Sequence, residues 1–418
     1  MWQKALNIVK VRTKERISRT YCAFSRRRDV EDEGDWCYSS EWWDQTNSNG
    51  QVVYRAASRH GNGVVSVKSY PSSSPRKEHW RETERWLASR QEGNKRFRVL
   101  GYEWRTLRFN DKTRQSTVKV MTARMDSQPR SLCLMQSPHC LAVPYLKSMV
   151  SLGLATIAAC NYNLIHSAIG KQTMRILCIG HGGGSLPLFL ACKIPGAIID
   201  IVEIDPVVIS ASITAMGFPS YSVVPPEKRA IEGSDSVSKI VWRGIHERIF
   251  LYECDAERFI LNTSNLYDIV FIDAYDGEDI FPFKLWDPDA PFLQTLKNKL
   301  HPHHGTVVVN LHSDDHDGHD DDDDDDGHDG IGNYINRVSR SYRDVITCGR
   351  GQDFGAAFSV SVPWICNTAL SVCRGKIVFN DSIMHTIASK GLEVERILNF
   401  PFPCWQYIAN GFKVVDSI

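Results

Sequence analysis

The chain has 418 residues, 42% of them hydrophobic, which suits two domains because single cores stop growing near about 250 to 300 residues. Its 49 Lys and Arg residues balance 49 Asp and Glu residues, so net charge argues against a nucleic-acid partner. No apolar run reaches the roughly 18 residues that cross a bilayer, which argues against a membrane protein. The twelve cysteines form no CxxC pair, and we expect a globular protein of the reducing cell interior, most simply the cytoplasm.

Residues 1–33 form a basic N-terminal extension, with nine Lys and Arg residues before position 29 against the single acid Glu15. Arg-rich, acid-poor segments are typical of transit peptides, which direct proteins to mitochondria or plastids. The extension has few serines and no apolar core, however, and a solvated extension is the alternative.

Residues 34–165 are expected to form a smaller, β-rich domain. Trp36–Arg98 is rich in Trp, Ser, Gly and Pro, which predicts short strands between turns. Apolar and polar residues then alternate on both sides of Asn110-Asp111, which indicates a β-hairpin. The elements expected here are strands at Phe97–Phe109, Ser116–Met121 and Ser131–Met135 and a buried helix at Pro144–Ala159.

Residues 166–375 are expected to form an α/β domain, followed by a helical tail at 376–418. From Met174 onward apolar runs alternate with helical periods, the pattern of a parallel sheet with crossover helices. A closing antiparallel hairpin is expected at Phe358–Pro363 and Ala369–Cys373. The expected strands are Arg175–Ile179, Ile198–Glu203, Ile249–Tyr252, Asp268–Asp273 and Thr306–Asn310, and the helices Ser185–Lys193, Pro206–Met216, Ala256–Leu261, Pro291–Leu300 and Ile331–Tyr342.

An aspartate-rich insert interrupts this domain at residues 314–330, which contain eleven aspartates. Neighbouring carboxylates repel one another and bury nothing, so the insert should be a disordered loop. Four histidines are interspersed among or beside the aspartates, but without regular ligand spacing, and we predict no metal site.

The strongest functional signal is an apolar strand that runs into a GxGxG turn, with a helix directly after it. Glycines allow positive φ and let a ligand approach the backbone, while the start of the helix supplies free N–H groups. The segment predicts a nucleotide-binding loop made of Gly180, His181, Gly182, Gly183 and Gly184.

Acids follow the next three strands. Glu203, which precedes Ile204 and Asp205, lies 23 residues beyond Gly180 and can accept both ribose hydroxyls of a nucleoside. Asp255, followed by Ala256, is placed to accept from an adenine amino group, and Asp273 and Asp276 to face the reacting centre. The alternatives are an ion-paired Glu203, a helix cap at Asp255, and an Asp273 that only orients the cofactor or caps a turn.

These motifs resemble the spermidine synthase-like branch of the S-adenosylmethionine-dependent methyltransferase superfamily. The likeness runs from about Phe97 to Gly375 and includes the hairpin, the glycine loop, Val-Glu-Ile-Asp, Tyr-Asp-Ile-Val-Phe-Ile-Asp-Ala-Tyr-Asp and the late Val362-Pro363. It is closer still to uncharacterised plant methyltransferase-like proteins that share Gly-His-Gly-Gly-Gly-Ser-Leu-Pro. The resemblance implies a Rossmann-like class I methyltransferase fold, bound S-adenosylmethionine and, as in spermidine synthases, a homodimer.

Two departures bear on the reaction. Aminopropyltransferases carry an aspartate in the glycine loop where this chain has Gly183, and the glycine should leave room for the carboxylate of ordinary S-adenosylmethionine. Their acidic, diamine-binding segment corresponds to Met135–Tyr145, which holds no carboxylate. A substrate pocket is still expected from Gln136, His139, Tyr145 and Tyr275.

The leading interpretation is a methyltransferase acting on an unidentified acceptor, with a protein amine favoured because similar domains occur among protein lysine methyltransferases. An amine arrives protonated, so a carboxylate must accept its hydrogen bonds or proton, and the candidates are Asp273 and its helper Asp276. The alternatives are an aminopropyltransferase and a cofactor-binding scaffold without turnover.

Overall fold

The computed structural model describes residues 50–71, 84–89, 97–111, 113–125, 132–224, 242–312, 330–348, 355–377 and 382–415. The basic extension and aspartate-rich residues 314–329 lie outside these ranges, so the interpretations of both stay predictions. Within them, none of the helices combines the length and the apolar character needed to cross a membrane.

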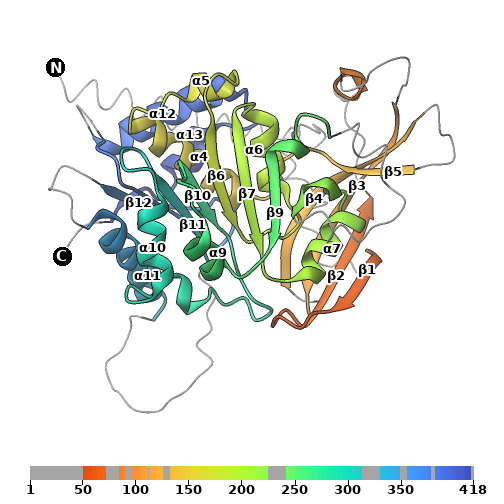
Figure 1. The fold of residues 1–418 in the computed structure, drawn as a ribbon, viewed down its shortest axis with the longest axis horizontal. Coiled ribbons are helices and arrows are strands. Elements are labelled where there is room, and N and C mark those ends of the chain that lie inside the picture. Colours follow the sequence, from red (N-terminus) through yellow and green to blue (C-terminus); the bar gives the residue numbers. More distant parts are fainter. Residues whose placement is uncertain are drawn as a thin grey trace, which may run out of the picture.

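The first sheet is antiparallel, with five strands in the order β1-β2-β3-β4-β5 (Figure 1). Its two longest strands, β3 and β4, form the hairpin that the alternation in the sequence predicted. In the turn, Asn110 and Asp111 take positive φ values of 49° and 57°, which Asn and Asp tolerate better than most residues. The strands are β1 (Gln51–Ala57), β2 (Val64–Pro71), β3 (Phe97–Phe109), β4 (Thr113–Met125) and β5 (Leu132–Gln136).

The second sheet has nine strands in the order β14-β12-β13-β11-β10-β6-β7-β9-β8. The strands from β11 to β8 in this order are parallel, and β13, β12 and β14 complete the sheet in antiparallel fashion. This arrangement confirms the expected Rossmann-like class I methyltransferase fold with its closing hairpin. The strands are β6 (Met174–Ile179), β7 (Ala197–Glu203), β8 (Val223–Val224), β9 (Ile249–Glu253), β10 (Ile269–Ile272), β11 (Thr306–His312), β12 (Ala356–Ser361), β13 (Asn367–Cys373) and β14 (Lys413–Val414).

Helices cover both faces of this sheet (Figure 1). Along β6, Ile176 and Cys178 belong to one hydrophobic core, and Leu177 and Ile179 belong to the other. Burial on both faces explains why the parallel strands read as continuous apolar runs. The helices are α4 (Pro144–Ala159), α5 (Leu164–Ala168), α6 (Ser185–Lys193), α7 (Pro206–Thr214), α9 (Ala256–Asn262), α10 (Pro291–Lys299), α11 (Gly330–Thr347), α12 (Ile383–Leu398) and α13 (Cys404–Ala409).

Helix α4 is the central helix of one face. Every residue of it except Tyr145 is buried, because it packs against β11, β13, α12 and α13. Its residues were assigned from the sequence to the N-terminal domain, but they lie in the core of the larger sheet. A helix that is apolar on all sides needs neighbours all around it, and this face supplies them.

The first sheet packs against helix α7 of the second. Val67, Leu107 and Val118 of the strands form one buried cluster with Val208 and Ala211 of the helix. Since α7 follows β7 directly, this packing brings the β3–β4 hairpin to the edge where the parallel strands end.

Candidate active site

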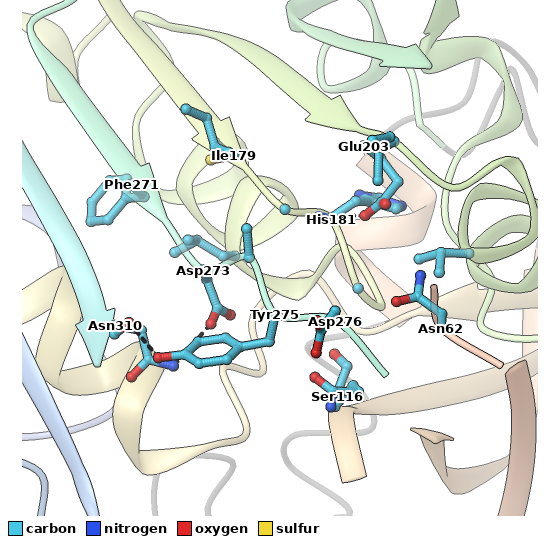
Figure 2. Close-up of a pocket in the computed structure, with 18 of the residues that line it drawn as sticks. Asn62, Ser116, Ile179, His181, Glu203, Phe271, Asp273, Tyr275, Asp276 and Asn310 are labelled. Carbon is cyan, nitrogen blue, oxygen red and sulfur yellow. Dashed lines mark hydrogen bonds between the residues drawn. The ribbon is translucent and has the colours of Figure 1, made fainter. Parts of the chain in front are cut away.

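A cavity of about 760 Å³ opens at the carboxyl ends of the parallel strands. Strand β6 lies between β7 and β10, so the order of the sheet reverses at β6, and ligands of α/β sheets bind at such a switch point. Figure 2 shows Glu203 and His181 on one side of the cavity, Asp273 and Asn310 on another, and Ser116 entering from the first sheet. The cavity therefore lies between the two sheets.

The glycine loop turns sharply at the end of β6. Gly180, Gly182 and Gly184 have φ values of 87°, 51° and 78°, in the left-handed region that favours glycine. A Cβ at Gly180 would lie 1.9 Å from the backbone oxygen of Asp273, so the loop passes directly over the end of β10. Gly184 then stands at the N-cap of α6. Glycine is required here by both conformation and space.

Glu203 ends β7 with its carboxylate buried beside the glycine loop. Its two oxygens accept hydrogen bonds from the backbone N–H groups of His181 and Asp205, both at 3.0 Å. Burial raises the pKa of Glu203 to about 7, although these hydrogen bonds act in the opposite direction. The carboxylate lines the cavity and is oriented by backbone groups alone.

Asp205 and Ile204 have different surroundings. Asp205 is fully buried, caps α7 by accepting from the N–H of Val207, and accepts a 2.8 Å hydrogen bond from Asn62. It therefore ties the β1–β2 turn to the second sheet and does not line the cavity. Ile204 does line the cavity and is 42% exposed.

His181 is the bulky member of the loop and lines the cavity with only 6% of its surface exposed. Its Nε2 lies 2.8 Å from Ser212 Oγ, and that hydroxyl donates to the backbone oxygen of Ile209. The Ser212 hydroxyl therefore links the His181 ring to the backbone of α7. Burial lowers the pKa of His181 to about 3, and the ring is neutral.

Asp273 follows β10 and accepts a 2.9 Å hydrogen bond from Nδ2 of Asn310. Oδ1 of Asn310 in turn accepts from Nδ2 of Asn367 at 3.0 Å, which fixes the orientation of the amide. Burial raises the pKa of Asp273 to about 6, against the lowering effect of the hydrogen bonds from Asn310 and Tyr145. All four residues line the cavity.

The remaining residues predicted near the reacting centre lie beside Asp273 and Asn310 in the cavity. The Tyr145 hydroxyl, which faces the Asp273 carboxylate, also lies 3.3 Å from the backbone oxygen of Gln115. The Tyr275 hydroxyl donates to the backbone oxygen of Asn310 at 2.9 Å. Asp276 lines the cavity, and its Oδ1 accepts from two backbone N–H groups of its own turn. Asp276 therefore shapes the loop that follows Asp273.

Asp255 caps a helix, which was one of the two roles that the sequence left open, and it also lines the cavity. Its Oδ1 caps α9 by accepting from the N–H of Arg258 at 3.1 Å, and its Oδ2 forms an ion pair with Lys284. Burial acts to raise the pKa of Asp255, but the lysine and the helix N–H groups together hold it below the usual value. The carboxylate and the neighbouring Ala256 line the cavity.

Two residues expected in the substrate pocket lie elsewhere. Gln136 is buried behind the glycine loop, where its Nε2 donates to the backbone oxygen of Gly183 at 2.7 Å. His139 contacts Cys192 at 3.4 Å and the ring of Trp86. Their part of the segment passes behind the loop because β5 pairs with β4, and Val143 and Tyr145 at its far end reach the cavity.

The space beside Gly183 also differs from the expectation. A Cβ at this position would lie 2.8 Å from Met216 and 2.9 Å from both Ser116 and Val118. Ser116 and Val118 of the first sheet, together with Met216, therefore fill the place where the side chain of a loop aspartate would lie. The glycine at position 183 does not open additional space for the carboxylate of a ligand. Among the described residues, no group of three or more His, Cys, Asp or Glu side chains is arranged to hold a metal ion.

Several cavity residues were not predicted. Asn310 could have been found, because it is the polar residue that follows the apolar run Val307–Val309 near the carboxyl end of a strand. Asn62, Ser116, Lys284 and Asn367 have no comparable signal, since each comes from a segment brought in by long-range packing.

No model of a known protein family matches the chain. The chain is similar to human eEF1A lysine and N-terminal methyltransferase, with 22% identity over 178 residues. That alignment covers 42% of this chain and only 23% of the human protein, so the chain spans about a quarter of its relative. The relative confirms the resemblance to the methyltransferase superfamily.

Solved structures align with the chain at modest TM-scores. Human methyltransferase-like protein 13, solved in complex with SAH, has 19% identity and a TM-score of 0.42, covering 62% of this chain and 93% of that one. A probable spermidine synthase from Corynebacterium glutamicum has 14% identity and a TM-score of 0.40, covering 73% and 87%.

Proposed function

We propose that this chain is an S-adenosylmethionine-dependent methyltransferase whose acceptor is an amine of a protein. The observation that carries the proposal is the convergence of three groups on one cavity: the glycine loop at Gly180, the carboxylate of Glu203 and the carboxylate of Asp273. The first two suit a nucleoside donor, and the third suits a cationic acceptor.

The residues that line the cavity fit S-adenosylmethionine as the methyl donor. The Glu203 carboxylate would accept the ribose hydroxyls, and the backbone of Gly180 and Gly182 allows close approach because neither residue has a side chain. Ile204 offers an exposed apolar surface for the adenine ring, and Asp255 retains acceptor capacity for its amino group. Ala256 lies beside them in the cavity.

The acceptor side suits an amine. When bound, S-adenosylmethionine supplies an electrophilic methyl group on a sulfonium. An amine with a pKa near about 10 arrives protonated and must lose its proton before it can attack. Asp273, held by neutral partners and with a pKa of about 6, is substantially ionised at neutral pH and can accept that proton. The amine would then have a free lone pair to accept the methyl group that the bound sulfonium would supply.

The choice of a protein amine is supported by the curated relative, which is named for methylating lysine and the N-terminus of a protein. Aminopropyl transfer is less well supported, because the place of an acid at Gly183 is filled by Ser116, Val118 and Met216.

The test is a product analysis with the purified chain. Methyl-tritiated S-adenosylmethionine and a protein extract should give labelled protein and S-adenosylhomocysteine, and Asp273→Asn should abolish labelling. Methylthioadenosine formed from decarboxylated donor and a polyamine would instead establish an aminopropyltransferase. Binding of the donor without turnover on any extract would leave the scaffold interpretation.

A further inference from the structure

We infer that Ser116 makes the donor site selective for a carboxylate-bearing sulfonium, by donating a hydrogen bond from its hydroxyl to the carboxylate of the methionine arm. The inference rests on the proposed function and assigns a residue of the first sheet to donor recognition.

Ser116 brings a hydroxyl from the first sheet to the wall of the cavity. It lies on β4, is 7% exposed and lines the cavity. Its Oγ is 2.9 Å from the Cβ position of Gly183 and 3.5 Å from that of Gly182, so the hydroxyl faces the glycine loop (Figure 2). A hydroxyl that faces a ligand cavity can exchange a hydrogen bond to water for one to a ligand that accepts its proton.

The arrangement of the cavity indicates which part of the donor lies there. Glu203 at the end of β7 suits the ribose, and Asp255 at the end of β9, one strand farther out, suits the adenine. Asp273 at the end of β10, on the opposite side of the loop, suits the methyl group and its acceptor. The amino acid arm is the part of the donor left to lie along Gly182, where the hydroxyl of Ser116 faces the loop.

The chemistry of Ser116 distinguishes two sulfonium donors. A hydroxyl donates to a carboxylate, whereas an aspartate would repel a carboxylate and attract an amine. An aspartate at position 183 would fit only if Met216, Ser116 and Val118 moved. A decarboxylated donor would leave Ser116 without an acceptor, so the site favours the donor that keeps its carboxylate.

Calorimetric titration with two nucleosides tests the inference. S-adenosylhomocysteine carries the methionine carboxylate, and methylthioadenosine lacks the whole arm. Ser116→Ala should weaken S-adenosylhomocysteine about tenfold and leave methylthioadenosine unchanged, as expected for one hydrogen bond to a charged group. Ser222→Ala, which removes another buried serine hydroxyl that does not line the cavity, should change neither.

A second variant gives the opposite signature. Ser116→Asp should weaken S-adenosylhomocysteine more than the alanine variant does, and should strengthen binding of the decarboxylated sulfonium. Equal effects of Ser116→Ala on both nucleosides, or no effect on either, overturn the role of Ser116 while the proposed function stands. A wild-type chain that binds neither nucleoside overturns both.

Discussion

Nδ2 of Asn310 lies 2.9 Å from Oδ1 of Asp273, and this hydrogen bond joins the ends of two neighbouring parallel strands. The amide cannot turn over freely, because its oxygen accepts from Asn367 across the β11–β13 pair. An acid with a raised pKa is thus held ionised by a neutral donor of fixed orientation. The Asp273 carboxylate can therefore accept a proton from a cationic methyl acceptor without first breaking an ion pair with Asn310, whose amide is neutral.

Removal of the Asn310 amide, which donates the hydrogen bond to Asp273, should shift the pH dependence of methyl transfer. Asn310 lowers the pKa of Asp273, so Asn310→Ala should raise that pKa further above about 6. Activity needs the ionised carboxylate, and the acidic limb of the rate profile should therefore move to higher pH, by about one unit. Asn367→Ala should cause a smaller shift in the same direction. Asn265→Ala removes an amide that contacts Asp200 outside the cavity and should shift nothing.

Replacement of the acid itself should separate binding from chemistry. Asp273→Asn keeps the size of the side chain and loses its proton acceptor. We expect the rate of methyl transfer at saturating donor to fall by about 100-fold or more, the usual contribution of a general base. The affinity for S-adenosylhomocysteine should change by less than about twofold, since Glu203 and the glycine loop are intact. A parallel loss of nucleoside binding would mean that Asp273 only orients the donor.

The glycine loop offers a matched pair for a stability measurement. Gly180 and Gly61 both have φ of +87°, but a Cβ at Gly180 would lie 1.9 Å from Asp273 O, whereas Gly61 has open space. Gly61→Ala should cost about 1 kcal/mol of unfolding free energy from backbone strain alone. Gly180→Ala should cost about 3 kcal/mol, because the strand ends must move apart. Urea denaturation followed by circular dichroism compares the two, and equal losses would show that the contact between strand ends is not tight.

The parts of the site that the sequence predicted are those that local pattern determines. The strand, the glycine turn and the helix follow one another within ten residues, and Glu203 ends the next strand. Because the two strands are parallel neighbours, the glycine turn and Glu203 must lie at the same edge of the sheet. Helix α6 begins and ends at the predicted residues for the same reason. The predicted helix from Pro206 ends two residues early, at Thr214, because the chain turns at Gly217 to pass β5.

The parts that the sequence did not predict depend on how two distant surfaces pack. Ser116 reaches the loop only because the first sheet lies on α7, and nothing in its local alternation indicates which end of which helix it will meet. Gln136 and His139 were placed in the pocket by resemblance, and the β4–β5 pairing turns them behind the loop. The oligomeric state stays a prediction for the same reason, since the partner of an exposed edge strand is not specified by its own sequence.

The raised pKa of Glu203 predicts how donor affinity varies with pH. Below about 7 the free carboxyl is protonated, and ribose hydroxyls bond better to the ionised form, so binding should lower the pKa and release a proton. The affinity for S-adenosylhomocysteine should therefore rise with pH between 6 and 8, by at most about tenfold per unit, and level off above. Titration calorimetry in two buffers of different ionisation enthalpy measures the released proton directly. Glu203→Gln should bind more weakly at every pH and show no rise, whereas Asp273→Asn should keep the rise. A wild-type affinity that is flat over this range would mean that Glu203 does not hold the ribose.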